Sequence, residues 1–399
     1  MYISKKISEI EHSPIRKFNR YALEAESRGV KVYRLNIGQP DVKTPGCFME
    51  AVRSCSSDII AYSESGGDTL LQDAMIDYFK RYDVNLTRDD IIITAGGSEA
   101  LSMAFSCILD TGDNVVIAEP FYTNYRTFIA AAGGEISPIT TTAETGYSYA
   151  DVSLIESAIN ERTRAIVCTN PGNPTGKTLS LADMELIGDI AIKHDLWLLA
   201  DEVYREFTYD GSEAISFGSL ERIQDRLIIT DSVSKRFSAC GARIGALISK
   251  NPGFMNCAMK LAQGRLSCPP LEQAGSAALY RLPASYFDTM RQEYEKRRDA
   301  GYRELSRIPG IVCSKPNGSF YIMAKLPVHD VEDFLMFLLR DFEDRGETVM
   351  FSPAKGFYMT PGLGEDEIRI ACVLNAHDLE RGAELIRLGL EQYLPRHSR

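Results

Sequence analysis

Short apolar runs alternate with longer amphipathic stretches along the first two thirds of the chain. The runs at 114–118, 164–169 and 227–229 are rich in aliphatic and β-branched residues, as is typical of strands that are buried on both faces. In the stretches between them, for example at 181–194, apolar residues recur at the spacing of a helix. Strands that alternate with helices in this way predict an α/β fold with a doubly wound, mostly parallel sheet.

The same patterns give a map of the expected elements. We expect strands at 32–37, 89–94, 114–118, 164–169, 196–200, 227–229, 318–324 and 367–372. We expect helices at 15–28, 69–82, from a glycine pair at 96–97 to 109, and at 181–194, 285–307 and 331–343. The regular alternation stops near residue 282, which indicates a second unit. We therefore expect a large domain at 45–283 and a smaller α/β domain built from both termini, 1–44 and 284–399.

Composition narrows the class of protein. The chain has 399 residues, of which 44% are hydrophobic and 25% charged, as in an ordinary soluble protein of about two or three domains. The formal net charge of −11 argues against nucleic acid or an anionic membrane as the main partner. The sequence contains no run of about 18 consecutive apolar residues and no apolar leader, so we expect neither a membrane span nor a signal peptide.

The cysteines and histidines do not form a metal-binding pattern. The nine cysteines are scattered, without a C-x-x-C pair, and the five histidines are dispersed. We interpret the cysteines as reduced, buried thiols of a cytoplasmic protein. No metal site is expected.

Candidate chemistry centres on one lysine that follows the strand at 227–229. Ser232 and Ser234 precede Lys235, and Arg243 follows it. A lysine that is partly removed from water, or that has a cationic neighbour, has a lowered pKa, and its free amine is a usable nucleophile. Two hydroxyls and a forked guanidinium are donors that suit a phosphate. A Schiff-base lysine beside a phosphate site indicates pyridoxal phosphate; an ordinary lysine in a polar loop is the alternative.

Other polar candidates follow expected strands, whose carboxyl ends line the ligand crevice of an open α/β sheet. The glycine pair 96–97 precedes a helix, and a helix N-terminus can bind phosphate. Asn173 lies in a loop that two prolines and two glycines stiffen, and Asp201 and Tyr204 follow the strand at 196–200. Arg369 interrupts an apolar strand, where a guanidinium needs an anion from the protein or from a substrate.

With these features in this order, the sequence resembles the fold type I pyridoxal-phosphate aminotransferases of class I and II and is similar to the aspartate aminotransferase family. The resemblance covers nearly the whole chain. The motifs that carry it are Gly38 with Pro-Asp, Tyr62, Gly-Gly-Ser-Glu-Ala at 96–100, Pro-Phe-Tyr at 120–122, Asn-Pro-Gly-Asn-Pro-Thr-Gly at 170–176, Asp-Glu-Val-Tyr at 201–204, Ser-x-Ser-Lys at 232–235, Arg-Ile-Gly at 243–245 and Ile-Arg-Ile at 368–370.

The resemblance implies a role for each motif. Lys235 would carry pyridoxal 5'-phosphate as a Schiff base and move protons, and Asp201 would keep the pyridine nitrogen protonated. The other residues expected around the cofactor are Tyr62, Gly97, Ser98, Tyr122, Asn173, Tyr204, Ser232, Ser234 and Arg243. The residues expected to bind the substrate are Gly38, Tyr122, Asn173 and Arg369, with Arg369 on the α-carboxylate. Tyr62 would reach the phosphate from a neighbouring subunit, so a homodimer with shared sites is expected.

The resemblance implies an L-amino acid and a 2-oxo acid as substrates. The motifs say less about which side chain the amino-acid substrate carries. A dicarboxylate needs a second cation; one branch of the family has it where this chain has Ser98, and Arg265 lies near the segment that another branch uses. Phe18, Phe121 and Tyr125 would instead favour an apolar or aromatic side chain. We expect aspartate or glutamate with 2-oxoglutarate or oxaloacetate. The alternatives are an aromatic, methionine or broad-specificity aminotransferase, or a C–S lyase of the same fold.

Two further classes fit the sequence less well. A regulatory protein that binds the cofactor without turnover would not need the complete set of Lys235, Asp201 and Arg369. A nucleotide-binding α/β enzyme would carry a G-x-G-x-x-G or G-x-x-x-x-G-K-[ST] loop, and this chain has neither.

Overall fold

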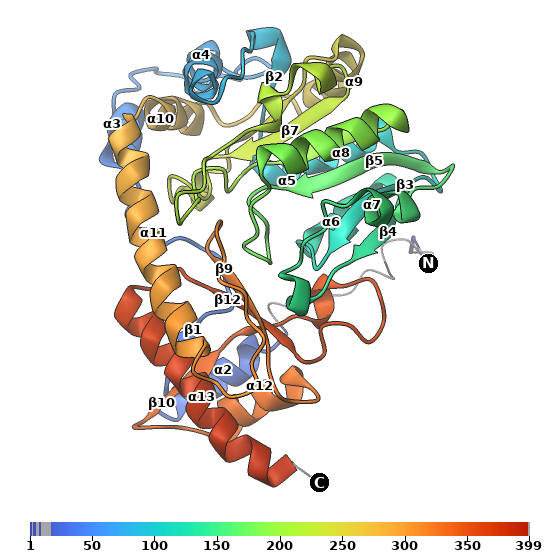
Figure 1. Cartoon of the computed structure of the whole chain (residues 1–399). Coiled ribbons are helices and arrows are strands. Elements are labelled where there is room, and N and C mark those ends of the chain that lie inside the picture. Colours follow the sequence, from blue (N-terminus) through green and yellow to red (C-terminus); the bar gives the residue numbers. More distant parts are fainter. Residues whose placement is uncertain (2, 5–7, 9–16, 398–399) are drawn as a thin grey trace.

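Three β-sheets organise the part of the chain that the structure describes, which is residues 1, 3, 4, 8 and 17–397 of this computed structural model. The seven-stranded sheet occupies the upper half of Figure 1 and has the order β2-β8-β7-β6-β5-β3-β4. Its strands are β2 (Ile91–Thr94), β3 (Asn114–Glu119), β4 (Glu135–Thr140), β5 (Thr163–Thr169), β6 (Trp197–Asp201), β7 (Leu227–Ser232) and β8 (Gly245–Ile248). Neighbours from β7 to β4 run parallel, whereas β8 is antiparallel to β2 and β7. The predicted mostly parallel α/β sheet is therefore confirmed.

Both faces of this sheet are buried, because alternate residues of a strand enter different hydrophobic cores. In β2, Ile91 and Ile93 belong to one core and Ile92 to the other. In β5, Ile166 and Val167 divide in the same way. A central strand with two buried faces must be apolar at nearly every position, which explains the uninterrupted apolar runs of the sequence.

Helices cover the two faces of the seven-stranded sheet. The first core includes residues of α4 (Thr69–Phe79), α7 (Val152–Ala158), α8 (Leu181–Lys193) and α10 (Pro270–Tyr280), and α3 (Gly46–Arg53) packs on α10. The second core includes residues of α5 (Gly97–Ile108), α6 (Asn124–Ala132) and α9 (Pro252–Arg265). Among the described helices, none combines the length and apolar character needed to cross a lipid bilayer.

Two smaller sheets lie in the lower half of Figure 1, where the N-terminal segment meets the C-terminal segment. The strands β9 (Tyr321–Lys325), β11 (Ser352–Pro353) and β12 (Glu367–Ala371) are antiparallel, and β1 (Lys31–Arg34) pairs in parallel with β10 (Glu347–Met350). Leu35 joins the two sheets, since its N–H donates to Met350 O and its carbonyl accepts from Ala371 N, both at 2.8 Å. The helices of this part are α2 (Asn19–Ser27), α11 (Ala284–Leu305), α12 (Val331–Arg340) and α13 (Ala376–His397).

Several element ends differ from those expected. The helix expected at 69–82 is α-helical to Phe79 and continues as a 3-10 turn, which ends where Asp83 adopts a left-handed conformation with φ 56°. The strand expected at 318–324 begins at Tyr321, since Ser319 has φ 50°. The strand expected at 32–37 ends at Arg34. Of the helix expected at 15–28, residues 15 and 16 lie outside the described residues, and α2 begins at Asn19.

Two strands of the large sheet are not predicted by the sequence pattern. β4 lies at the sheet edge, is exposed or half-buried at every position except Ile139, and contains Pro138, so it lacks the apolar run of a central strand. β8 is four residues long and follows directly on the Arg243 motif, so its apolar character is easily assigned to that loop.

Gly245 begins β8 where this strand passes the glycine pair 96–97. A Cβ at this position would lie 2.6 Å from the carbonyl carbon of Gly96 and 2.7 Å from both Asp231 O and Gly97 N. These neighbours are backbone atoms, which cannot rotate away. The close approach of β8 to the loop before α5 therefore requires glycine.

We predict that Gly245→Ala lowers the free energy of unfolding by about 1–3 kcal/mol, because the added methyl group overpacks the site. Urea denaturation measures the change. The matched control is Gly46→Ala, whose Cβ would meet only the Glu50 side chain at 3.6 Å and should stay within about 0.5 kcal/mol of wild type. Equal stability of the two variants contradicts the close approach.

Candidate active site

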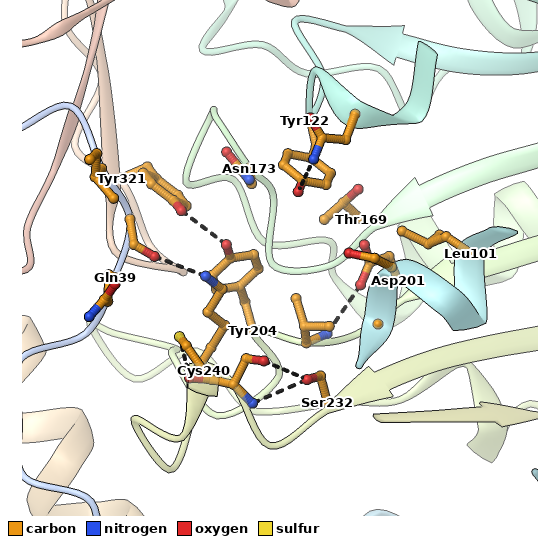
Figure 2. A pocket seen from close by; sticks show the side chains of 18 of the residues that line it. Gln39, Leu101, Tyr122, Thr169, Asn173, Asp201, Tyr204, Ser232, Cys240 and Tyr321 are labelled. Carbon is orange, nitrogen blue, oxygen red and sulfur yellow. Dashed lines mark hydrogen bonds between the residues drawn. The ribbon is translucent and has the colours of Figure 1, made fainter. Parts of the chain in front are cut away.

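A cavity of about 340 Å³ opens at the carboxyl ends of β5, β6 and β7. Loops that follow these strands form one wall, and the other walls come from the segment after β1, from α5 and from β9 and β12. Figure 2 shows side chains from these separate segments turned towards one another. The candidate residues that line the cavity are Gly38, Gly97, Ser98, Tyr122, Asn173, Asp201, Tyr204, Ser232, Ser234, Lys235, Arg243 and Arg369.

Lys235 lies in the turn after β7 and directs its amine into the cavity. Its Nζ donates a hydrogen bond to the carbonyl oxygen of Gly38 at 2.9 Å. Gly38 has to be glycine, since a Cβ there would lie 1.9 Å from the hydroxyl oxygen of Tyr321. The bare backbone of the N-terminal segment can therefore approach the lysine closely.

Hydrogen-bond donors converge beside Lys235. The hydroxyl oxygens of Ser232 and Ser234 lie 2.8 Å apart. The Arg243 guanidinium lies against the loop before α5, where Nη2 donates to Ala95 O at 3.2 Å and a Cβ on Gly96 would come within 2.4 Å of it. Because α5 begins at Gly97, its free N–H groups and the positive end of its dipole face the same place. This arrangement can hold a phosphate group.

Asp201 ends β6 as a buried carboxylate with only neutral hydrogen-bond donors. Tyr125 donates its hydroxyl to Oδ2 at 2.7 Å, and the N–H of Val203 donates to Oδ1 at 3.4 Å. Its side chain forms no salt bridge with any described lysine or arginine, and burial raises the pKa of Asp201 to about 6. The carboxylate is thus available for a cation that enters the cavity.

Three tyrosines and an amide group also line the cavity. The hydroxyl groups of Tyr204 and Tyr321 are 3.0 Å apart (Figure 2). Tyr122 accepts a hydrogen bond from the Asn124 amide at 2.7 Å, and burial raises the pKa of Tyr122 to about 12. Burial also raises the pKa of Tyr204, so the hydroxyls of Tyr122 and Tyr204 are neutral donors and acceptors at neutral pH.

Arg369 is a buried guanidinium, 1% exposed, with uncharged neighbours. It donates to the side-chain oxygen of Asn173 at 3.1 Å and to the carbonyl oxygen of Asn36 at 2.8 Å. The ring of Tyr321 lies 4.4 Å from the guanidinium carbon. No described carboxylate forms a salt bridge with it, and burial lowers the pKa of Arg369. A buried cation that faces a cavity without a counter-ion is suited to an anionic ligand.

Five candidates from the sequence do not line the cavity. Tyr62 lies on a loop and is 80% exposed. Arg265 turns inwards, with Nε 3.4 Å from Glu99 and Nη2 donating to Ile93 O at 3.0 Å. The aromatic candidates for the substrate side chain are buried in the hydrophobic cores instead; they are Phe18, Phe121 and Tyr125.

The structure adds residues that the sequence did not single out for these positions. Tyr125, in the first turn of α6, donates a hydrogen bond from its hydroxyl to Asp201. Tyr321 enters from β9, in the small antiparallel sheet. The position of Tyr125, three residues after Tyr122, is a signal in the sequence that could have identified it. No local pattern in the sequence marks Tyr321. Among the described residues, no group of three or more His, Cys, Asp or Glu could hold a metal ion.

Comparisons with known proteins give one family. The family model described as Aminotransferase class I and II matches residues 30–386. The aspartate aminotransferase of Bacillus subtilis (strain 168) is 30% identical over 98% of this chain and 100% of its own length. Among solved structures, a single mutant of the Thermus thermophilus aspartate aminotransferase has a TM-score of 0.89 at 25% identity, covering 98% of this chain and 100% of its own. The alanine aminotransferase from Pyrococcus furiosus has a TM-score of 0.88 at 30% identity, covering 99% and 100%.

We predict that Asp201→Asn stabilises the unliganded protein at pH 7 by about 1–3 kcal/mol. Burial raises the pKa of Asp201 to about 6, whereas an unfolded aspartate titrates near about 3.9. The group therefore contributes stability that is fully present below pH 4 and is lost as the pH rises through about 6.

Urea titrations between pH 4 and pH 8 measure this difference. The advantage of the variant over wild type should grow from pH 4 to pH 6 and then stay level. Asp58→Asn, at an exposed position, is the control and should show no such trend. If the difference in free energy of unfolding between Asp201→Asn and wild type does not change with pH, Asp201 is not a buried carboxylate without a counter-ion.

Proposed function

The chain belongs to the class I and II aminotransferase family, and from this premise we propose that it binds pyridoxal 5'-phosphate and uses it to exchange an amino group between an L-amino acid and a 2-oxo acid. The single observation that carries the proposal is a pair of buried, opposite charges at one cavity. Asp201 and Arg369 both line it, and neither has a counter-ion among the described residues. A ligand that brings a cation to Asp201 and an anion to Arg369 compensates both.

The donor set supports pyridoxal phosphate as that ligand. The phosphate would lie on Gly97, Ser98, Ser232, Ser234 and Arg243, where donors and a helix N-terminus converge. The protonated pyridine nitrogen would face Asp201, whose carboxylate has no other cation. Tyr122 would stack on the ring, and Asn173 and Tyr204 would donate to its phenolic oxygen.

The chemistry divides between the cofactor and the chain. When bound, pyridoxal phosphate supplies an aldehyde for amino groups and a ring that stabilises negative charge at the substrate's Cα. Lys235 would hold the cofactor through Nζ and, once released, would take up the Cα proton at the same nitrogen. Arg369 would bind the α-carboxylate as a fork, with Gly38 and Asn173 beside it, and so would orient the Cα–H bond towards the lysine.

We propose a homodimer in which each subunit completes the other's site. Tyr62 is 80% exposed on its own subunit, far more than is usual for a large aromatic residue. Ile59 and Ile60, on the same loop, are 74% and 68% exposed. An apolar loop of this kind is typical of an interface, and Tyr62 would then reach the phosphate of the neighbouring subunit.

For the amino acid we propose aspartate or glutamate, with 2-oxoglutarate or oxaloacetate as acceptor. The relative from Bacillus subtilis, which is named an aspartate aminotransferase, supports this choice. The lysines and arginines that line the described cavity are Lys235, Arg243 and Arg369, and each already has a proposed role. The distal carboxylate would therefore depend on neutral donors such as Gln39 and Asn124, or on the second subunit.

A second candidate is an amino acid with an uncharged side chain, such as an aromatic amino acid or methionine. The observation that favours it is the cavity wall itself, where Ile37, Tyr122 and Tyr321 provide apolar surface. A C–S lyase of the same fold would use the same cofactor contacts, because the fate of the substrate after loss of the Cα proton depends on small differences in geometry.

We predict that Lys235→Ala lowers turnover by more than about 10⁴-fold and removes the visible absorbance of bound cofactor, because both attachment and proton transfer depend on Nζ. Steady-state assays and absorption spectra measure the two effects. Lys296→Ala, on the exposed side of α11, is the control and should behave as wild type. Turnover by Lys235→Ala within tenfold of wild type rules the assignment out.

A screen of single half-reactions decides the substrate. The enzyme is loaded with pyridoxal phosphate and mixed with one amino acid at a time, and the loss of cofactor absorbance gives the rate. We expect aspartate and glutamate to react at least about tenfold faster than phenylalanine, tyrosine or methionine, the discrimination that hydrogen bonds to a distal carboxylate can provide. The opposite order favours the second candidate. Ammonia and pyruvate in place of a 2-oxo acid that matches the donor indicate a lyase.

A further inference from the structure

A cluster of buried charges lies directly behind the two loops that carry Asp201 and Lys235. We call it the ion cluster and define it as Tyr78, Glu202, Arg205, Glu206, Asp231 and Arg236. Each member is at most 1% exposed, and none lines the cavity. In the sequence its members alternate with cavity residues, since Glu202 follows Asp201 and Arg236 follows Lys235.

Arg236 connects the two loops. Its guanidinium forms a salt bridge with Asp231, five residues back at the end of β7, and Nη2 also donates to the carbonyl oxygen of Glu202 at 3.2 Å. Its other terminal nitrogen donates to the Tyr78 hydroxyl on α4 at 2.5 Å. One planar group thus contacts the end of β7, the loop that follows β6 and the covering helix α4.

Asp231 and Glu202 hold the cluster from the strand ends. The second oxygen of Asp231 lies 3.9 Å from Arg205, and its first oxygen accepts the N–H of Ser232 at 2.8 Å. Glu202 binds the Arg205 guanidinium and accepts the N–H of Phe217 at 2.8 Å. Ser232 belongs to the proposed phosphate site. The salt bridge between Arg236 and Asp231 is therefore linked to a cavity residue by the single hydrogen bond from Ser232 to Asp231.

Stability alone is a weak reason to bury such a cluster. Removing several charges from water is unfavourable, and well-packed apolar residues of similar size often give equal or greater stability. Apolar residues, however, would not fix the distance between two loops, whereas a forked guanidinium with defined partners does. The geometry therefore points to a role in positioning.

We propose that Arg236 is a positioning residue that sets the distance between Lys235 and Asp201. The proposal rests on the function proposed above, in which one cofactor ring must reach both side chains. Lys235 directly precedes Arg236, and Asp201 directly precedes Glu202, so the contact from Arg236 to the Glu202 carbonyl joins the immediate neighbours of the two. A shift of about 1 Å at a catalytic group can lower a rate by about 10²-fold.

The test compares Arg236→Lys with Arg298→Lys. Lysine keeps the charge at position 236 but cannot contact Asp231, Tyr78 and Glu202 together. Arg298 is the matched control, because it is also buried and salt-bridged, to Asp210, but neither it nor Asp210 adjoins Lys235 or Asp201 in the sequence. Urea denaturation of each apoenzyme measures how much each substitution lowers the free energy of unfolding, an effect that we expect of both.

Two further measurements isolate positioning. We expect the half-reaction rate at saturating amino acid to fall by about 10²-fold in Arg236→Lys, while the amino-acid concentration for half-saturation stays within about threefold of wild type because Arg369 is untouched. The apoenzyme's affinity for pyridoxal phosphate, read by fluorescence titration, should fall by about tenfold. Arg298→Lys should change neither quantity.

Wild-type rate and wild-type cofactor affinity in folded Arg236→Lys overturn the proposal, as does an equal loss of both quantities in Arg298→Lys. If Arg236→Lys does not fold, Tyr78→Phe decides, since it removes one partner of Arg236 and keeps the ring. A fall in cofactor affinity and saturated rate by about threefold or more in that variant supports positioning, and unchanged values refute it. Wild-type protein that binds no pyridoxal phosphate refutes the proposed function instead, so the two failures are distinct.

Discussion

The pairing of β5, β6 and β7 in register is the constraint on which the cavity depends. Thr169 lies opposite Asp201, and Asp201 lies opposite Thr230. Parallel strands stand about 4.8 Å apart, so the loops that carry Asn173, Tyr204 and Lys235 begin side by side. A slip of one residue would turn Asp201 from the cavity towards the helices that cover the sheet. The apolar cores on both faces therefore also determine the chemistry at the strand ends.

The sequence could reveal those features that follow from local order along the chain. Buried parallel strands have a distinct pattern, and residues that directly follow them must lie at the crevice, so Asp201 and Lys235 could be placed together before the structure was known. Tyr125 and Tyr321 could not be assigned their roles, because only the packing of α6 and of a separate sheet directs them to the site. The strand β4 lacks the apolar pattern because it lies at the sheet edge, where only Ile139 of its six residues is buried.

The two arginines that the sequence suggests as substrate contacts lie in different electrostatic surroundings. Arg265 lies 3.4 Å from Glu99, a residue distant in sequence, so its charge is already balanced. Arg369 is surrounded by amide oxygens and aromatic rings and has no such partner. The difference depends on which residues meet in space, and a single sequence contains no record of that.

The position of Leu35 between Met350 and Ala371 has a consequence for the order of assembly. Gly38, which lies at the amine of Lys235, is held in place by strands that leave the ribosome near the end of synthesis. The contacts of the seven-stranded sheet are complete by Ile248, and a domain of this kind can fold while the chain is still growing. The strand ends that carry Asp201 and Lys235 can thus form early in synthesis, and the walls that Gly38 and Arg369 add to the cavity come into place only when translation is almost finished.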